Sequence, residues 1–155
     1  MIKVGLEHAF TMRVSLSERM HMGKTPRGYA RGFVGVKGGT IDGPRLQGEI
    51  VPDTGGDYPF IYDDGSATFE AKYFLRASDG TLILLHNRGF RHGPKDRLDA
   101  LLRGEEIDPD AIYFRLNPRF EVPADSPHVW MTKTVFVGVG NRKKDHSVFT
   151  YYAVT

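Results

Sequence analysis

The segment at residues 38–50, GGTIDGPRLQGEI, constrains most strongly what this chain can fold into. It places four glycines and one proline between two apolar runs. A helix does not tolerate this composition, because glycine loses much backbone entropy on ordering and proline lacks an N–H donor. The segment is therefore predicted to be a tight, bent connection between β-strands.

Short apolar runs separated by glycine, proline and Asp-Gly pairs recur along the rest of the chain. In residues 67–77 apolar and polar side chains alternate with period two, which is typical of a strand with one buried face. The pair Asp79-Gly80 then predicts a two-residue type I′ hairpin turn. The predicted strands cover residues 4–14, 27–37, 46–51, 67–77, 81–91, 112–122, 129–140 and 147–154.

One helix is predicted, over residues 94–103. Pro94 suits the first helical turn, three leucines form an apolar stripe, and Gly104 ends the helix. About eight antiparallel strands and one helix, with no linker in 155 residues, predict a single all-β domain over residues 1–155. A closed antiparallel β-barrel is favoured, because closure removes exposed strand edges. A barrel of about eight strands can hold side chains or one small ligand, and the helix is expected to cover one end.

Composition excludes several classes of function. The 21 basic and 19 acidic residues make a mixed surface, which indicates no nucleic-acid partner, and Arg142-Lys143-Lys144 is interpreted as a solvated loop. The absence of cysteine excludes disulfides, thiolate nucleophiles and zinc–thiolate sites. No apolar run approaches the roughly 20 residues that span a bilayer, and no signal peptide is visible. A soluble, cytoplasmic protein that does not bind membranes is expected.

The sequence also lacks the common cofactor and metal motifs. None of the six histidines has another at metal-ligand spacing, so no histidine metal site is predicted. There is no P-loop, no dinucleotide fingerprint in a βαβ context and no G-x-S-x-G elbow. Chemistry without a cofactor is the remaining prediction.

Strand parity predicts which side chains line the barrel interior. The inward faces are expected to carry a few polar tips among apolar side chains, as in a small-molecule pocket. The alternative is that the aromatic residues are ordinary core side chains. The side chains in question are Tyr73, Asn87, Trp130, Thr132 and Tyr152.

Asp57 and Tyr58 are expected on a flexible glycine-rich loop at the barrel mouth. Asp57 is the candidate general base, provided that the pocket desolvates it and raises its pKa. The alternative is that its carboxylate only accepts hydrogen bonds from its own turn. Tyr58 and Tyr73 are candidates for donating a proton or polarising a carbonyl group.

Tyr113 and Arg115 share one face of a predicted strand, and Phe114 lies on the other. If the first face points inward, Tyr113 is a proton donor and Arg115 is a clamp for an anionic ligand, because a buried unpaired charge is costly. If the second face points inward, Arg115 is a surface side chain. Parity alone leaves both arrangements open.

The chain resembles the bacterial and fungal family called domain of unknown function 3237. An ordered set of motifs over nearly the whole chain carries the resemblance. These motifs are Thr25-Pro26-Arg27-Gly28, residues 38–49, Gly56-Asp57-Tyr58, Asp64-Gly65, Asp79-Gly80, Asn87-Arg88-Gly89, Tyr113-Phe114-Arg115, Pro118-Arg119-Phe120-Glu121 and Phe136-Val137-Gly138.

The resemblance implies a barrel of the calycin or allene-oxide-cyclase type, compatible with homo-oligomers, and activities such as cofactor-free cyclase or lyase chemistry. Two positions depart from the family pattern, which has tryptophan at Tyr58 and asparagine at Thr132. If that asparagine is catalytic, Thr132 retains a hydrogen-bonding group with a shorter reach.

Residues and resemblance together predict an enzyme that binds a hydrophobic, aromatic or polyketide-like molecule bearing a carbonyl, phenol or carboxylate. Acid–base chemistry would lead to cyclisation, isomerisation or dehydration. The alternatives are a non-catalytic ligand-binding protein and a packed barrel that serves as a protein interaction module.

Overall fold

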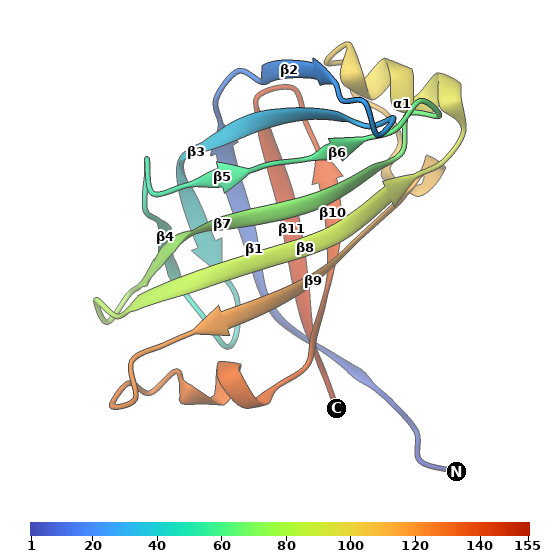
Figure 1. Ribbon diagram of the computed structural model, residues 1–155. Coiled ribbons are helices and arrows are strands. Elements are labelled where there is room, and N and C mark those ends of the chain that lie inside the picture. Colours follow the sequence, from blue (N-terminus) through green and yellow to red (C-terminus); the bar gives the residue numbers. More distant parts are fainter.

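Eleven strands form one antiparallel sheet in the computed structural model, which describes residues 1–155 (Figure 1). One α-helix and two short 3-10 helices complete the chain. The elements are β1 (Leu6–Leu16), β2 (Met20–Lys24), β3 (Ala30–Asp42), β4 (Gly48–Ile50), β5 (Gly56–Asp57), β6 (Phe60–Ile61), β7 (Ala67–Ala77), β8 (Leu82–His92), α1 (Lys95–Leu102), η1 (Pro109–Ala111), β9 (Tyr113–Glu121), η2 (Val129–Lys133), β10 (Phe136–Arg142) and β11 (His146–Val154).

Strand β3 closes this sheet into a barrel. Neighbouring strands follow the order β1-β11-β10-β9-β8-β7-β4-β3, and β3 also pairs with β1. The short strands β4, β5 and β6 share one place between β3 and β7. The ring therefore has eight positions, and the prediction of a closed antiparallel barrel of about eight strands is confirmed.

The glycine-rich segment forms the corner of a hairpin between β3 and β4, as predicted. Gly39 lies opposite Val14 of β1 on one side and Ile50 of β4 on the other. Its φ is 145°, and a methyl group there would overlap the carbonyl oxygen of Arg13. Glycine is needed at this position because two strands approach the β3 backbone closely.

The barrel interior is packed at one end. Phe10, Phe120, Phe136 and Tyr151 pack against one another, with ring centroids 5.1–6.5 Å apart. They belong to a cluster of 20 buried hydrophobic residues that extends from this end to the walls of the interior near the other end. The packed end is capped by η2, whose Met131 is buried in the cluster.

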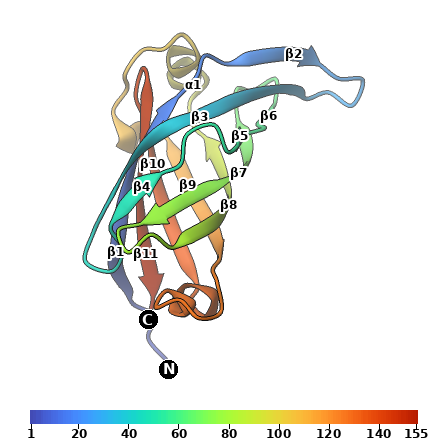
Figure 2. The same ribbon diagram turned by 90° about the vertical axis from the view of Figure 1, so that its left-hand side faces the viewer.

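Strand β2 and the first part of β3 extend away from the barrel, as Figure 2 shows. All five residues of β2 are exposed, and this strand pairs only with β3. Ser17, just before β2, continues the pairing along β3, since its hydroxyl accepts a 2.8 Å hydrogen bond from the Gly35 N–H. The loop between β1 and β2 is thus held over the open end of the barrel.

The predicted helix is present as α1 and lies beside that open end (Figure 1). Pro94 is its N-cap, and Leu98 and Leu101 are buried as the apolar stripe predicted. No helix of the chain is long and apolar enough to cross a membrane.

Two local predictions were wrong. Residues 129–133 form η2 rather than the start of a strand, and hydroxyl donation to carbonyl oxygens three or four residues back accompanies this winding. Thr132 donates to Val129 and Thr134 to Trp130, each at 2.8 Å.

The turn at Asp79-Gly80 is also longer than predicted. The Ala77 N–H donates to the Thr81 carbonyl, which leaves three residues in the loop. Gly80 has φ of 89° but Asp79 has no positive φ, whereas a type I′ turn needs positive φ at both central residues.

Replacing Gly39 with alanine is expected to lower the free energy of unfolding by about 3 kcal/mol or more, because the methyl group meets backbone that cannot move aside. Gly80→Ala is the matched control: its φ is also positive, but no atom lies within 4 Å of the added methyl group. That variant should lose about 1–2 kcal/mol. Urea unfolding measures both, and equal losses would contradict the role of Gly39 in closure.

Candidate active site

A cavity lies inside the open end of the barrel, where β1, β8 and β10 finish and β7, β9 and β11 begin. Its volume is about 70 Å³, measured as the space open to the centre of a water molecule. One water molecule needs roughly 10–15 Å³ of such space. The cavity therefore has room for several waters, or for a ligand body of about one aromatic ring. Ten of the 16 lining residues are hydrophobic, so the walls are mainly apolar.

The lining residues come from eight strands and from the loop between β1 and β2. Small residues on β10 leave room for large rings: a side chain at Gly140 would meet the Phe114 ring, which lines the cavity, and one at Gly138 the Tyr151 ring of the packed core. The lining residues are Val14, Leu16, Arg19, Val34, Val36, Asp57, Phe69, Ala71, Tyr73, Asn87, Arg91, Phe114, Leu116, Arg142, Ser147 and Phe149.

Asp57 carries the one carboxylate in this lining. It lies on β5, paired between β3 and β7, and therefore not on the flexible loop that the sequence predicted. Its Oδ1 accepts a 2.9 Å hydrogen bond from the Glu70 N–H of β7, rather than from its own turn. Burial raises the pKa of Asp57 to about 6, while this hydrogen bond and nearby arginines, Arg91 first, act in the opposite direction.

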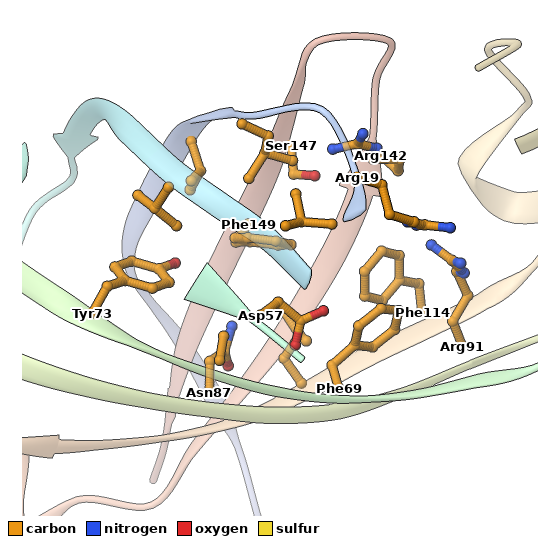
Figure 3. A pocket seen from close by; sticks show the side chains of 16 residues that line it. Arg19, Asp57, Phe69, Tyr73, Asn87, Arg91, Phe114, Arg142, Ser147 and Phe149 are labelled. Atoms are coloured by element: carbon orange, nitrogen blue, oxygen red, sulfur yellow. The ribbon is translucent and has the colours of Figure 1, made fainter. Parts of the chain in front are cut away.

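Tyr73 and Asn87 line the cavity across from the arginine side (Figure 3). The Tyr73 hydroxyl and the Asn87 Oδ1 are buried without a hydrogen-bond partner. Asn87 Nδ2 donates to the Tyr151 hydroxyl at 2.8 Å. Burial, and secondarily the charge of Asp57, raises the pKa of Tyr73, so this phenol stays protonated at neutral pH.

Three arginines join Ser147 in completing the polar lining, and none of the three arginines was predicted there. Arg19 comes from the loop between β1 and β2, Arg91 from β8 and Arg142 from the end of β10. Figure 3 shows them on one side of the cavity, with Asp57 between them and the Tyr73 side. Arg91 had a sequence signal, because it shares strand parity with Asn87; Arg142 was wrongly interpreted as part of a solvated loop.

The structure decides the orientation of β9. Phe114 and Leu116 are buried and line the cavity, whereas Tyr113 and Arg115 are exposed on the outside. Tyr113 stacks on His92 with ring centroids 4.7 Å apart. The prediction that Tyr113 donates a proton and Arg115 clamps an anion in the pocket was therefore wrong, because the alternation along β9 turns both outward.

Four other predicted site residues also lie outside the cavity. Tyr152 packs on His8 on the outer face, and Tyr151 takes the inward position because the parity of β11 is the reverse of that predicted. The Tyr58 side chain is 53% exposed, and its ring packs against that of Phe33. Trp130 and Thr132 lie on η2 at the opposite end of the barrel, where Trp130 stacks with Arg45.

Asp57, Tyr73 and Asn87 are thus the predicted residues that the fold brings together, and their roles stay predictions. No group of three or more His, Asp or Glu side chains in the chain is arranged to hold a metal ion. The chemistry that this lining itself supplies is one carboxylate, one phenol, one amide, one aliphatic hydroxyl (Ser147) and three guanidinium groups.

The sequence matches the family described as "Protein of unknown function (DUF3237)" over residues 4–154. The UPF0311 protein RPA1785 of Rhodopseudomonas palustris is 32% identical over 148 residues, which cover 96% of this chain and 95% of the relative. The crystal structure of a conserved protein of unknown function, RPA1785 from Rhodopseudomonas palustris, has a TM-score of 0.90 at 29% identity and covers 100% of this chain and 99% of that chain.

Two further crystal structures share the fold. A "beta-barrel like protein" from Acinetobacter baumannii AYE has a TM-score of 0.85 at 30% identity, covering 99% of this chain and 98% of its own. "An enzyme from Penicillium herquei" has a TM-score of 0.72, covering 98% and 95%; at 16% identity the similarity shows the fold alone.

Asp57→Asn is expected to stabilise the protein at pH 8. An acid whose pKa is raised on folding binds more protons in the folded state between about pH 4 and 6, so wild-type stability falls as the pH rises through that window. Asparagine does not ionise and escapes this loss. The difference between a pKa of about 6 and the ordinary 3.8 sets the gain at about 3 kcal/mol at most.

Urea unfolding at pH 4.5 and pH 8 measures this gain, which should be largest at pH 8 and shrink as the pH falls. Asp53→Asn is the control, because Asp53 is an exposed carboxylate paired with Lys37 in the nearby loop. A loss of stability at pH 8 in Asp57→Asn would show instead that the arginines hold Asp57 ionised.

Proposed function

The chain belongs to the DUF3237 family, and we propose that this member is a cofactor-free enzyme that transfers protons within a small hydrophobic molecule bound in the barrel cavity. One observation supports the proposal above all others. The cavity contains a carboxylate with a pKa of about 6 and, across from it, a phenol that stays protonated. Two titratable groups whose environments separate their pKa values in this way suit a base and an acid.

Asp57 is the base in this proposal. A general base is most effective when its pKa lies near the working pH, because it is then ionised and still basic enough to accept a proton. Its Oδ1 is oriented by the Glu70 N–H, so the carboxylate is fixed relative to the cavity. It would remove a proton from a carbon or hydroxyl group next to a substrate carbonyl.

Tyr73 is the matching hydrogen-bond donor. Its hydroxyl has no partner in the protein, so it is free to donate to the carbonyl oxygen on which negative charge develops. Returning the proton to another atom completes an isomerisation. Loss of a neighbouring hydroxyl group as water, with Asp57 returning its proton to the leaving oxygen, leads instead to dehydration. If Asp57 takes its proton from a substrate hydroxyl, that oxygen adds to a conjugated C=C bond and the proton returns to the carbon next to the carbonyl, which closes a ring.

The fold is compatible with catalysis at this site. A distant structural neighbour with the same barrel is described as an enzyme from Penicillium herquei. A non-catalytic binding protein would use the same cavity, and the unpaired Tyr73 and Asn87 oxygens would serve a ligand equally well. A solidly packed interaction module is disfavoured, since the open end of the barrel is not filled by side chains.

Proton transfer is tested by deuterium exchange at the acidic carbon of aromatic carbonyl compounds, followed by NMR in D₂O. Benzoylacetone serves as a neutral probe and phenylpyruvate as an anionic one. The protein should accelerate exchange for at least one of them, and Asp57→Asn should lower the rate by about 10²–10⁴-fold. Asp53→Asn should keep the wild-type rate.

Tyr73→Phe tests the role of the hydrogen-bond donor separately from that of the base Asp57, because it removes only the hydroxyl group. It should slow exchange by about 10-fold or more while the binding of the probe persists. Binding of a probe with exchange rates equal in the wild type and Asp57→Asn would favour the non-catalytic binding protein instead.

A further inference from the structure

The three arginines around the cavity have no carboxylate partner in the protein. None of them takes part in a salt bridge within 4.0 Å, and Asp57 is not paired with any of them at that distance. The arginines that do form ion pairs are Arg76, Arg88, Arg97 and Arg103, all on the surface. The positive charge in the cavity is therefore concentrated and unpaired.

Arg91 is the most deeply buried of the three arginines. It is only 3% exposed, and its Nε has no hydrogen-bond acceptor. Its guanidinium lies near the faces of Phe69 and Phe114, 5.0 and 5.6 Å from their centroids, which compensates only part of the cost of burying a charge. Burial, followed by repulsion from Arg19 and Arg142, lowers the pKa of Arg91 to about 10.

The Asp57 carboxylate cannot balance the positive charge of the three arginines. Asp57 supplies at most one negative charge against three guanidinium groups, and its raised pKa makes even that charge incomplete near pH 6. The protein offers no acceptor for the Arg91 Nε, so a water molecule or a ligand has to supply one. Planar guanidinium groups bind carboxylates through paired N–H donors, which fits a ligand anion on this side of the cavity.

The rest of the cavity describes the body of that ligand. Phe69, Phe114 and Phe149 line it together with aliphatic residues, so the part beyond the anion is apolar. The volume of about 70 Å³ suits one ring. Asp57 lies between the arginines and Tyr73 (Figure 3), which places the base near the atoms that join ring and anion.

We propose that the cavity binds a single-ring aromatic carboxylate, with its carboxylate group held by Arg19, Arg91 and Arg142 and its ring among the phenylalanines. This inference rests on the proposed function, because it names the substrate class of the same site. It predicts that the reacting carbon lies close to the carboxylate, as in an aryl-substituted 2-oxo acid.

Isothermal titration calorimetry with phenylacetate, phenylpyruvate and phenylacetamide tests the proposal. The amide has nearly the shape of phenylacetate but no charge. The acids should bind one per chain, and the amide at least about 10-fold more weakly, as expected for losing a charge-assisted hydrogen-bond pair. Phenyl phosphate and inorganic phosphate are included to detect a phosphate site.

Variants of the three arginines then test where the carboxylate group of the ligand binds. We expect each of three single variants to weaken the binding of phenylacetate by about 10–100-fold and to leave the affinity for the amide unchanged: Arg91→Gln, Arg142→Gln and Arg19→Gln. Arg19 and Arg142 are less buried than Arg91, so these two variants keep the test valid if Arg91→Gln does not fold. Arg115→Gln, on the outer face of β9, is the matched control and should bind like the wild type.

Three results would overturn the proposal: equal binding of acid and amide, preference for phenyl phosphate over phenylacetate, or no binding of any acid. Its failure is distinguishable from that of proton transfer. Arginine-dependent binding of acids without Asp57-dependent exchange would refute only the catalytic function. Asp57-dependent exchange of benzoylacetone without acid binding would refute only the carboxylate site.

Discussion

Pairing between β1 and β3 is the contact on which the rest of this structure depends. It turns an open sheet into a ring, so that the inward faces of eight strand positions enclose one interior. Because β3 also pairs with β4 along the same residues, its backbone lies between two close neighbours at Gly39. Without closure, Asp57 of β5 and Ser147 of β11 would not face a common space.

The enclosed interior is divided into two ends with different properties. One end is filled by interlocking aromatic rings and capped by η2, and this packing supplies the apolar burial that stabilises a domain of this size. The other end is left open and contains charged and polar groups without protein partners. Unpaired buried groups cost stability, so their concentration at one end is what a binding or catalytic site would require.

Strand parity explains both the success and the failure of site prediction. On β7 and β8 the alternation is long and regular, and Tyr73 and Asn87 were placed on the inward face from sequence. On β9 both faces carry aromatic residues, so the sequence did not distinguish Phe114 from Tyr113. On β11 two adjacent tyrosines made the parity ambiguous by one residue, and Tyr151 rather than Tyr152 faces inward.

What the sequence by itself determined is local. Glycine and proline positions, period-two alternation and the leucine stripe identified most strands, the helix and the barrel class, because these signals arise from backbone sterics and from burial of one face. Only the tertiary structure decided the membership of the site. Arg19, Arg91 and Arg142 lie more than 120 residues apart at their extremes, and only Arg91 has a local signal, its strand parity with Asn87. They converge because the register of eight strand positions brings their ends to the same opening, a long-range geometry that no local pattern encodes.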